Sequence, residues 1–189
     1  TNEINRMLTV SMILRKANKG EIDLLGPAKA ITKELMSIPD FDSSNGSVIH
    51  KEIKLVKNFK KALLLVAGAA VQKFGEKIAN EQEVLMNIAD IINTVYLCES
   101  TLLRVQKAGS KDNYKNYSSQ LNILKVLIYD SCDKIIKSGK DVIYSIAEGD
   151  ESTMMLLGLK RFTKHTGLNT ISLRRKIAKK LIEENKYCF

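Results

Sequence analysis

Tryptophan is absent from this 189-residue chain, which also contains only two Pro and ten Gly. So few turn-forming residues argue against a loop-rich β protein and against a disordered tail. Aromatic residues make up only 6% of the chain, so the core must be built mainly from aliphatic side chains. Because 44% of the residues are hydrophobic and 27% are charged, the composition predicts a soluble, helical, globular chain with an ordinary core.

Patterns typical of disulfides, secretion and membrane spans are also missing. The three cysteines, Cys98, Cys132 and Cys188, are far apart and form no CxxC pair, which fits a reducing cytoplasm. Cys98 and Cys132 lie in apolar helical patterns, where a free cysteine usually acts as a small hydrophobic residue. The longest apolar run, Ala62 to Val71, is far shorter than the ~20 residues of a membrane span, and no signal peptide is visible. We therefore expect a cytoplasmic protein with that run in a buried helix.

No residue pattern of a complete catalytic or metal site is present. A di-metal centre in a helical bundle needs Glu-x-x-His pairs, but Ser47 and Phe162 stand three positions before His50 and His165. The chain also lacks a G-x-S-x-G nucleophile motif and a Gly-rich phosphate loop. We therefore predict no catalytic residue and no metal ligand within this chain.

Positive charge is concentrated near the C-terminal end. The formal net charge is +9, and residues Lys160 to Phe189 hold nine Lys or Arg against two Glu. Such a stretch could contact phosphate, anionic lipid or an acidic partner. A basic helix face is more often simply solvated, and we favour that interpretation. Aromatic residues suited to base stacking are not interleaved with these charges, so nucleic acid is the weaker target.

Apolar periodicity and helix breakers divide the chain into three parts. A first helix is expected over residues 2–19, and a second has Pro27 in its first turn, where the missing N–H costs nothing. The segment 38–47, IPDFDSSNGS, has the composition of a linker. We predict that residues 1–37 are separated by this linker from a helical domain over residues 48–189.

Three long helices and two shorter ones are predicted after the linker. The long helices cover about residues 48–74, from Asn80 to the break at AGSKDN, and 117–147, and the shorter ones cover 153–164 and 170–185. Asn80 is a natural N-cap, and Glu83 can reach back to it. The apolar residues that follow alternate in steps of four and three, which packs helices at about 20°; they are Val84, Ile88, Ile91, Val95, Cys98, Leu102 and Val105. Together these helices predict an all-α, up-and-down bundle preceded by a long helix.

Two acidic residues lie close to predicted apolar faces. Asp90 and Asp133 could each act as an acid in a pocket. Buried polar groups are usually hydrogen-bonded, so we favour the interpretation that each accepts bonds from a neighbouring helix.

The chain opens with TNEINRMLTV, a helix start crowded with polar groups. Free N–H groups and the positive end of the helix dipole suit a phosphate or the polar edge of a flavin. Thr1, Asn2 and Glu3 can add side-chain contacts beside those N–H groups. The simpler interpretation is that Thr1 and Asn2 cap the helix, and physical grounds alone favour the cap.

Several segments resemble the acyl-CoA dehydrogenase family. TNEINRMLTVSMI is similar to the start of the last helix of the catalytic core in these flavoproteins. The segment from Asn58 to Arg104 resembles the appended C-terminal domain of the very-long-chain type, including the Asn80-Glu81-Gln82 triplet and the Ala89-Asp90 pair. RRKIAKKLIEENKY, residues 174–187, resembles the closing helix of bacterial relatives.

The resemblance implies an FAD-dependent parent enzyme that oxidises acyl-CoA thioesters between the α and β carbons, as in fatty-acid β-oxidation. It places Thr1, Asn2 and Glu3 in contact with FAD and gives Arg6 a structural role. The proton-abstracting Glu of the common branch would lie two residues before Thr1, so the catalytic base is not in this chain. The chain alone is therefore expected to be an inactive C-terminal fragment that acts as a structural and interface domain.

The resemblance also implies partners, and a second hypothesis stays open beside it. The expected partners are the rest of the dehydrogenase core and further copies in a homo-oligomer, with some contact with the inner membrane. An apolar patch is expected to be uncovered on the first helix around Met7, Val10 and Leu14. The alternative is a stand-alone basic helical adaptor that binds an anionic membrane surface or an acidic partner through Lys160 to Lys186.

Overall fold

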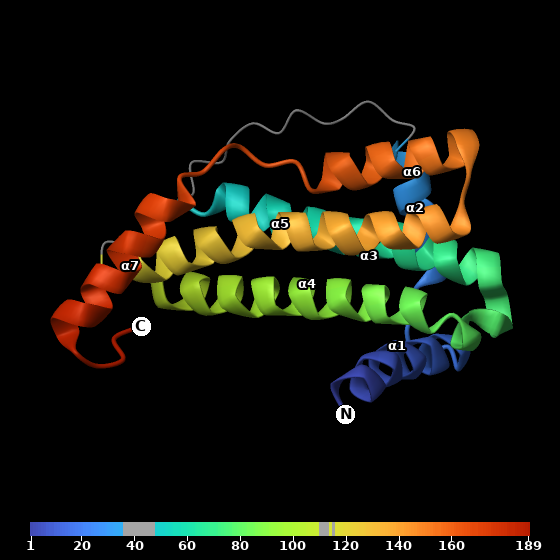
Figure 1. The fold of residues 1–189 in the computed structure, drawn as a ribbon, viewed down its shortest axis with the longest axis horizontal. Helices are drawn as coiled ribbons and strands as arrows, with labels where there is room; N and C mark the ends of the chain where they lie inside the picture. The colour runs from blue at the N-terminus through green and yellow to red at the C-terminus, as the bar shows by residue number, and fades with distance from the viewer. Residues whose placement is uncertain (36–47, 110–113, 115) are drawn as a thin grey trace.

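The computed structural model describes residues 1–35, 48–109, 114 and 116–189, and these ranges are helical without a β-strand. The elements are α1 (Asn2–Asn18), α2 (Leu25–Leu35), α3 (His50–Phe74), the 3₁₀-helix η1 (Gly75–Asn80), α4 (Gln82–Gly109), α5 (Ser118–Ile146), α6 (Gly149–Phe162) and α7 (Thr170–Glu184). Figure 1 shows the long helices running back and forth along one axis. The predicted all-α bundle is confirmed.

Three long helices form the body of the bundle. α3, α4 and α5 pack against one another along the long axis, and α6 folds back over α3 and α5 (Figure 1). α2 packs on α3, and α1 packs on α4 near one end of the molecule. α7 packs on α5 at the opposite end, so the start of the chain and its basic end lie on different parts of the bundle.

Predicted helix boundaries on the described residues agree with the structure to within two residues, except at the start of α6, and one predicted cap is wrong. Asn80 is not the N-cap of α4, because it ends η1 and α4 begins at Gln82. Gly75, at φ +53°, ends α3 and leads the chain into η1 before the next helix can begin. α6 begins at Gly149 rather than near Thr153, because Gly149 at φ +58° turns the chain directly after α5.

The predicted linker, residues 38–47, lies outside the described residues, and the division into three parts stays a prediction. The helix before it is nevertheless tied to the bundle. Lys61 Nζ of α3 lies 2.6 Å from Glu34 Oε1 of α2, and Arg161 Nη1 of α6 donates to the Glu34 carbonyl oxygen at 3.2 Å. α2 is therefore held by contacts with both α3 and α6.

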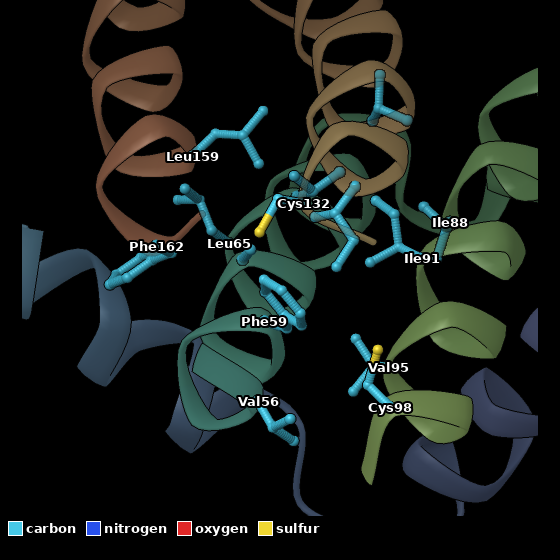
Figure 2. Packing of buried hydrophobic residues seen from close by; sticks show 14 of the residues in the cluster. Val56, Phe59, Leu65, Ile88, Ile91, Val95, Cys98, Cys132, Leu159 and Phe162 are labelled. Carbon is cyan, nitrogen blue, oxygen red and sulfur yellow. The ribbon is translucent and has the colours of Figure 1, made fainter. Parts of the chain in front are cut away.

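The core is aliphatic, as the composition predicts. All seven seam residues predicted for α4 are buried. Figure 2 shows Phe59 of α3, Ile91 of α4 and Cys132 of α5 pointing toward a shared interior. Each fully buried large aliphatic or aromatic side chain contributes roughly 1.5–3 kcal/mol to folding, so this shared interior is the main source of stability.

Close packing brings α6 onto the bundle. A Cβ added to Gly139 of α5 would lie 2.8 Å from Leu159 Cδ2 of α6. A Cβ added to Gly158 of α6 would lie 2.8 Å from Leu35 Cδ2 of α2. Both distances are shorter than real Cβ contacts, so glycine at these two positions allows α6 to pack against α5 and α2.

The apolar run Ala62–Val71 forms the second half of α3, and none of its residues is fully exposed. This confirms the prediction of a core helix. Across the described residues, no helix combines the length and the hydrophobicity needed to cross a membrane.

The apolar patch predicted on the first helix is wrong in its position. Val10 is buried, and Met7 and Leu14 are half-buried, because this side of α1 packs against α4. The exposed apolar side chains of α1 are instead Ile4, Leu8 and Met12, at 64%, 51% and 52% exposure. These three residues recur every four positions and form a stripe on the helix surface, here named the α1 stripe.

Candidate functional site

The start of α1 leaves its first-turn N–H groups without side-chain caps. Thr1 occupies the N-cap position, and its carbonyl oxygen accepts the Asn5 N–H bond at 3.0 Å, but its side chain makes no capping bond. The favoured interpretation of Thr1 and Asn2 as a plain cap is therefore wrong for the Thr1 side chain. Thr1, Asn2 and Glu3 are all exposed, and the Thr1 hydroxyl is not committed to capping this helix end.

A helix end of this kind can hold an anion. Its free N–H groups point outward, and the helix dipole places partial positive charge there. A phosphate fits this chemistry, and the hydroxyl and amide of Thr1 and Asn2 can add hydrogen bonds. The Glu3 carboxylate accepts hydrogen bonds, so it suits the hydroxyl groups of a ligand rather than its phosphates.

A polar hollow of about 510 Å³ separates this helix start from α4. Its walls consist of Asn2, Asn5, Arg6 and Thr9 from α1 and Asp90 and Asn93 from α4. The α1 residues fall on one face because positions three and four apart are neighbours on a helix surface. We call this space the α1–α4 hollow, and it places Asn2 in the same cavity as an ion pair between the two helices.

That ion pair joins Arg6 Nη2 to Asp90 Oδ2, two residues 84 positions apart in the sequence. The prediction that Asp90 accepts a hydrogen bond from a neighbouring helix is confirmed. The structural role predicted for Arg6 agrees with this contact. Neither side chain is fully buried, since 28% of Arg6 and 43% of Asp90 remain exposed.

The same prediction is wrong for Asp133. It is exposed on α5, beside a second polar hollow lined also by Asp90 and Asn93 of α4 and by Lys134 and Lys137 of α5. An exposed carboxylate is hydrated by water and needs no partner from another helix. The sequence pattern misplaced Asp133 because Cys132, the residue before it, carries the buried position at this turn of α5.

The buried cysteines are structural. Cys98 and Cys132 are fully buried, which confirms their predicted role as core residues, and Cys188 is half-buried. Cys98 Sγ donates to Ser131 Oγ at 3.1 Å, and Cys132 Sγ donates to the Ile128 carbonyl oxygen at 3.4 Å. Burial raises the pKa of the Cys132 thiol to about 12, with smaller effects from Asp133 and Cys98, and burial also raises the pKa of the Cys98 thiol.

Sequence reasoning missed an apolar groove between α2, α3 and α6. It has a volume of about 1040 Å³, and Leu64, Ala69 and Met154 belong to its lining. Lys29 and Lys33 stand on its α2 side, and Asp150 and Glu151 stand on its α6 side. No sequence signal could have found it, because its lining comes from three helices that the bundle brings together.

The C-terminal basic residues lie mostly on α7. Arg174, Arg175, Lys176 and Lys179 are exposed, as expected for a solvated face. Arg174 Nη2 binds both carboxylate oxygens of Asp130 on α5, at 2.8 and 2.7 Å. No residue of α7 is buried, and Ile171 and Ile182 are 62% and 76% exposed.

Within the part of the chain that the structure describes, no group of three or more His, Cys, Asp or Glu side chains could hold a metal ion. The described features therefore define a helical-bundle domain whose most promising ligand site is the helix start beside the α1–α4 hollow.

Comparisons with known proteins identify the family. The family model for the C-terminal domain of acyl-CoA dehydrogenase matches residues 58–161. A probable acyl-CoA dehydrogenase from Bacillus subtilis (strain 168) is 36% identical over 187 residues, which is 99% of this chain and 31% of the relative. The chain belongs to the family of acyl-CoA dehydrogenase C-terminal domains.

A solved structure gives the same relationship in three dimensions. An acyl-CoA dehydrogenase from Bacillus anthracis, crystallised in complex with FAD, superimposes with a TM-score of 0.92 at 36% sequence identity. The match covers 100% of this chain and 32% of that structure. The chain therefore spans about one third of the length of the relatives that it matches.

The thiol environments predict selective reactivity. At pH 8, an aromatic disulfide reagent should label Cys188 in the folded chain, while Cys98 and Cys132 stay unlabelled, because only the thiolate reacts. All three should react after unfolding in guanidinium. Rapid labelling of Cys132 in the folded chain, measured by absorbance and peptide mapping, would contradict its burial.

Proposed function

We propose that this chain is the C-terminal region of an FAD-dependent acyl-CoA dehydrogenase and serves there as a structural and interface domain. The observation that carries this proposal is the match to the FAD complex from Bacillus anthracis over the whole chain. The assignment to the very-long-chain type rests on short motifs and stays a prediction.

In this proposal, Thr1, Asn2 and Glu3 contact FAD at the start of α1. The fit rests on the exposed first turn and on the Thr1 side chain, which makes no capping bond. FAD supplies the capacity to accept the β-hydride of an acyl-CoA, and the residues of α1 hold and orient its polar part. We assign the base that removes the α-proton to the rest of the parent enzyme.

The α1 stripe supports contact with the catalytic core. Ile4, Leu8 and Met12 lie on the surface of α1, away from the side that packs on α4. A row of large apolar side chains is costly to leave in water. We propose that the core of the parent covers this stripe, and that copies of the isolated chain associate through it.

A basic surface on α7 supports a weaker, second contact. Ile171 and Ile182 are exposed beside Arg175 and Lys179, a combination found on helices that lie in the interface of an anionic membrane. We propose that the region Lys160 to Lys186 gives a cytoplasmic parent peripheral contact with such a membrane. The stand-alone adaptor has less support, because the family match accounts for the bundle as part of a longer enzyme.

The cofactor proposal predicts a flavin-dependent parent enzyme. The full-length protein should purify with FAD and reduce it on addition of an acyl-CoA. Thr1→Val combined with Asn2→Ala should weaken FAD binding about tenfold, because two hydrogen bonds of ~0.5–1.5 kcal/mol each are lost. Asn18→Ala, at the far end of α1, is the matched control. Isothermal titration should detect no FAD binding by the isolated chain, and a micromolar affinity there would contradict this expectation.

The interface proposal predicts self-association of the isolated chain. Its mass measured by light scattering should rise with concentration, and Leu8→Lys should return it to a monomer by placing a charge in the α1 stripe. Leu103→Lys changes an equally exposed leucine on α4 and should leave association unaltered. A wild-type chain that stays monomeric over a wide concentration range would count against this interface.

The membrane proposal predicts salt-dependent binding to lipid. The chain should cosediment with vesicles containing phosphatidylglycerol at low ionic strength, but not with neutral phosphatidylcholine vesicles, and salt should release it. Arg175→Glu with Lys179→Glu should abolish the binding. Lys137→Glu, which alters a basic residue on α5, is the control. Absence of binding at low salt would remove this contact.

A further inference from the structure

The Arg6–Asp90 ion pair connects the candidate cofactor site to the bundle. We propose that Asp90 of α4 is a positioning residue, which orients the FAD-facing start of α1 through Arg6. This inference rests on the proposed function, because it concerns the same cofactor. It assigns a role in cofactor binding to a residue of the bundle that lies far from Thr1 in the sequence.

The start of α1 has few other contacts to hold it. Thr1 to Asn5 are all exposed, and Arg6 is the first residue along the chain that is not. Val10 is the only residue of α1 that is buried. The contacts of α1 with the bundle therefore begin at Arg6 and the half-buried Met7, and the first fully buried residue, Val10, follows one turn later.

Helix geometry links the position of Arg6 to that of Asn2 at the start of α1. Asn2 and Arg6 are four residues apart, so they lie on the same face of α1, one turn from each other. Both also line the α1–α4 hollow together with Asp90. When Asp90 holds the Arg6 guanidinium, it limits rotation of α1 about its axis and thereby sets the direction in which the Asn2 amide points.

The ion pair is better suited to orientation than to stability. Both side chains are partly exposed, and such pairs contribute little to the free energy of unfolding. Arg6 Nε, in contrast, is buried and has no acceptor within the described part of the chain. The Nε edge of the guanidinium is thus shielded from water, and Asp90 supplies a carboxylate that compensates the charge at Nη2.

A second interhelical pair provides a matched control on the same helix. Lys60 of α3 binds Glu99 of α4, and the Glu99 side chain is 37% exposed, compared with 43% for Asp90. This pair joins α4 to α3 and does not touch α1. Loss of Glu99 should therefore reproduce the electrostatic cost of removing a half-exposed carboxylate without affecting the start of α1.

The test uses the full-length parent enzyme. Asp90→Asn should raise the dissociation constant for FAD about fivefold, in line with the loss of one partly exposed charged contact. Arg6→Gln should have the same effect, and the double variant should be no worse than either single one. Glu99→Gln should leave FAD binding unchanged.

Rescue separates positioning from a general structural effect. The exchanged pair Arg6→Glu with Asp90→Arg should recover most of the FAD affinity, while each single charge reversal should lose it. The inference is overturned if Asp90→Asn binds FAD like the wild type, if Glu99→Gln weakens binding equally, or if the exchanged pair gives no recovery. A wild-type parent that binds no FAD would reject the proposed function and this inference together, whereas normal wild-type binding with an indifferent Asp90→Asn would reject the inference alone.

Discussion

The packing of aliphatic side chains along α4 is the interaction on which the rest of the structure depends. Its seam residues, among them Ile88, Ile91 and Val95, are buried against α3 and α5. Apolar contacts carry no direction of their own, so the regular steps of three and four residues set how the helices align. α1, α6 and α7 pack on the outside of the body formed by α3, α4 and α5.

Ion pairs between helices join the outer elements to the body of the bundle. Arg6–Asp90 joins α1 to α4, Lys61–Glu34 joins α3 to α2, and Arg174–Asp130 joins α5 to α7. Exposed or half-exposed pairs of this kind usually contribute no more than about 1 kcal/mol each to stability. Their effect is strongest where the apolar contact is weakest, since α1 has only one buried residue and α7 has none.

This arrangement gives the proposed role of the bundle in a flavoenzyme a physical basis. The family match and the FAD complex of a relative place the chain in a dehydrogenase context. In the proposed parent, α1 belongs to two environments at once. One face packs on α4 and the opposite face carries the α1 stripe, so the bundle and the catalytic core would fix the same helix from two sides. The cofactor-facing first turn then depends on both.

Much of the fold followed from the sequence, because helix periodicity and breaking residues are local properties. The three long helices, the α4 seam and the buried positions of Cys98 and Cys132 were all predictable in this way. The errors arose where tertiary contacts decide: Asn80 ended a 3₁₀-helix, Asp133 faced solvent, and the side of α1 that was expected to be uncovered, around Val10, packed on α4. The partnership of Arg6 with Asp90 and the hollow beside Asn2 likewise came only from the structure. Sequence by itself determined which segments are helical and which residues avoid water, but the rotation of each helix about its axis depends on what packs against it.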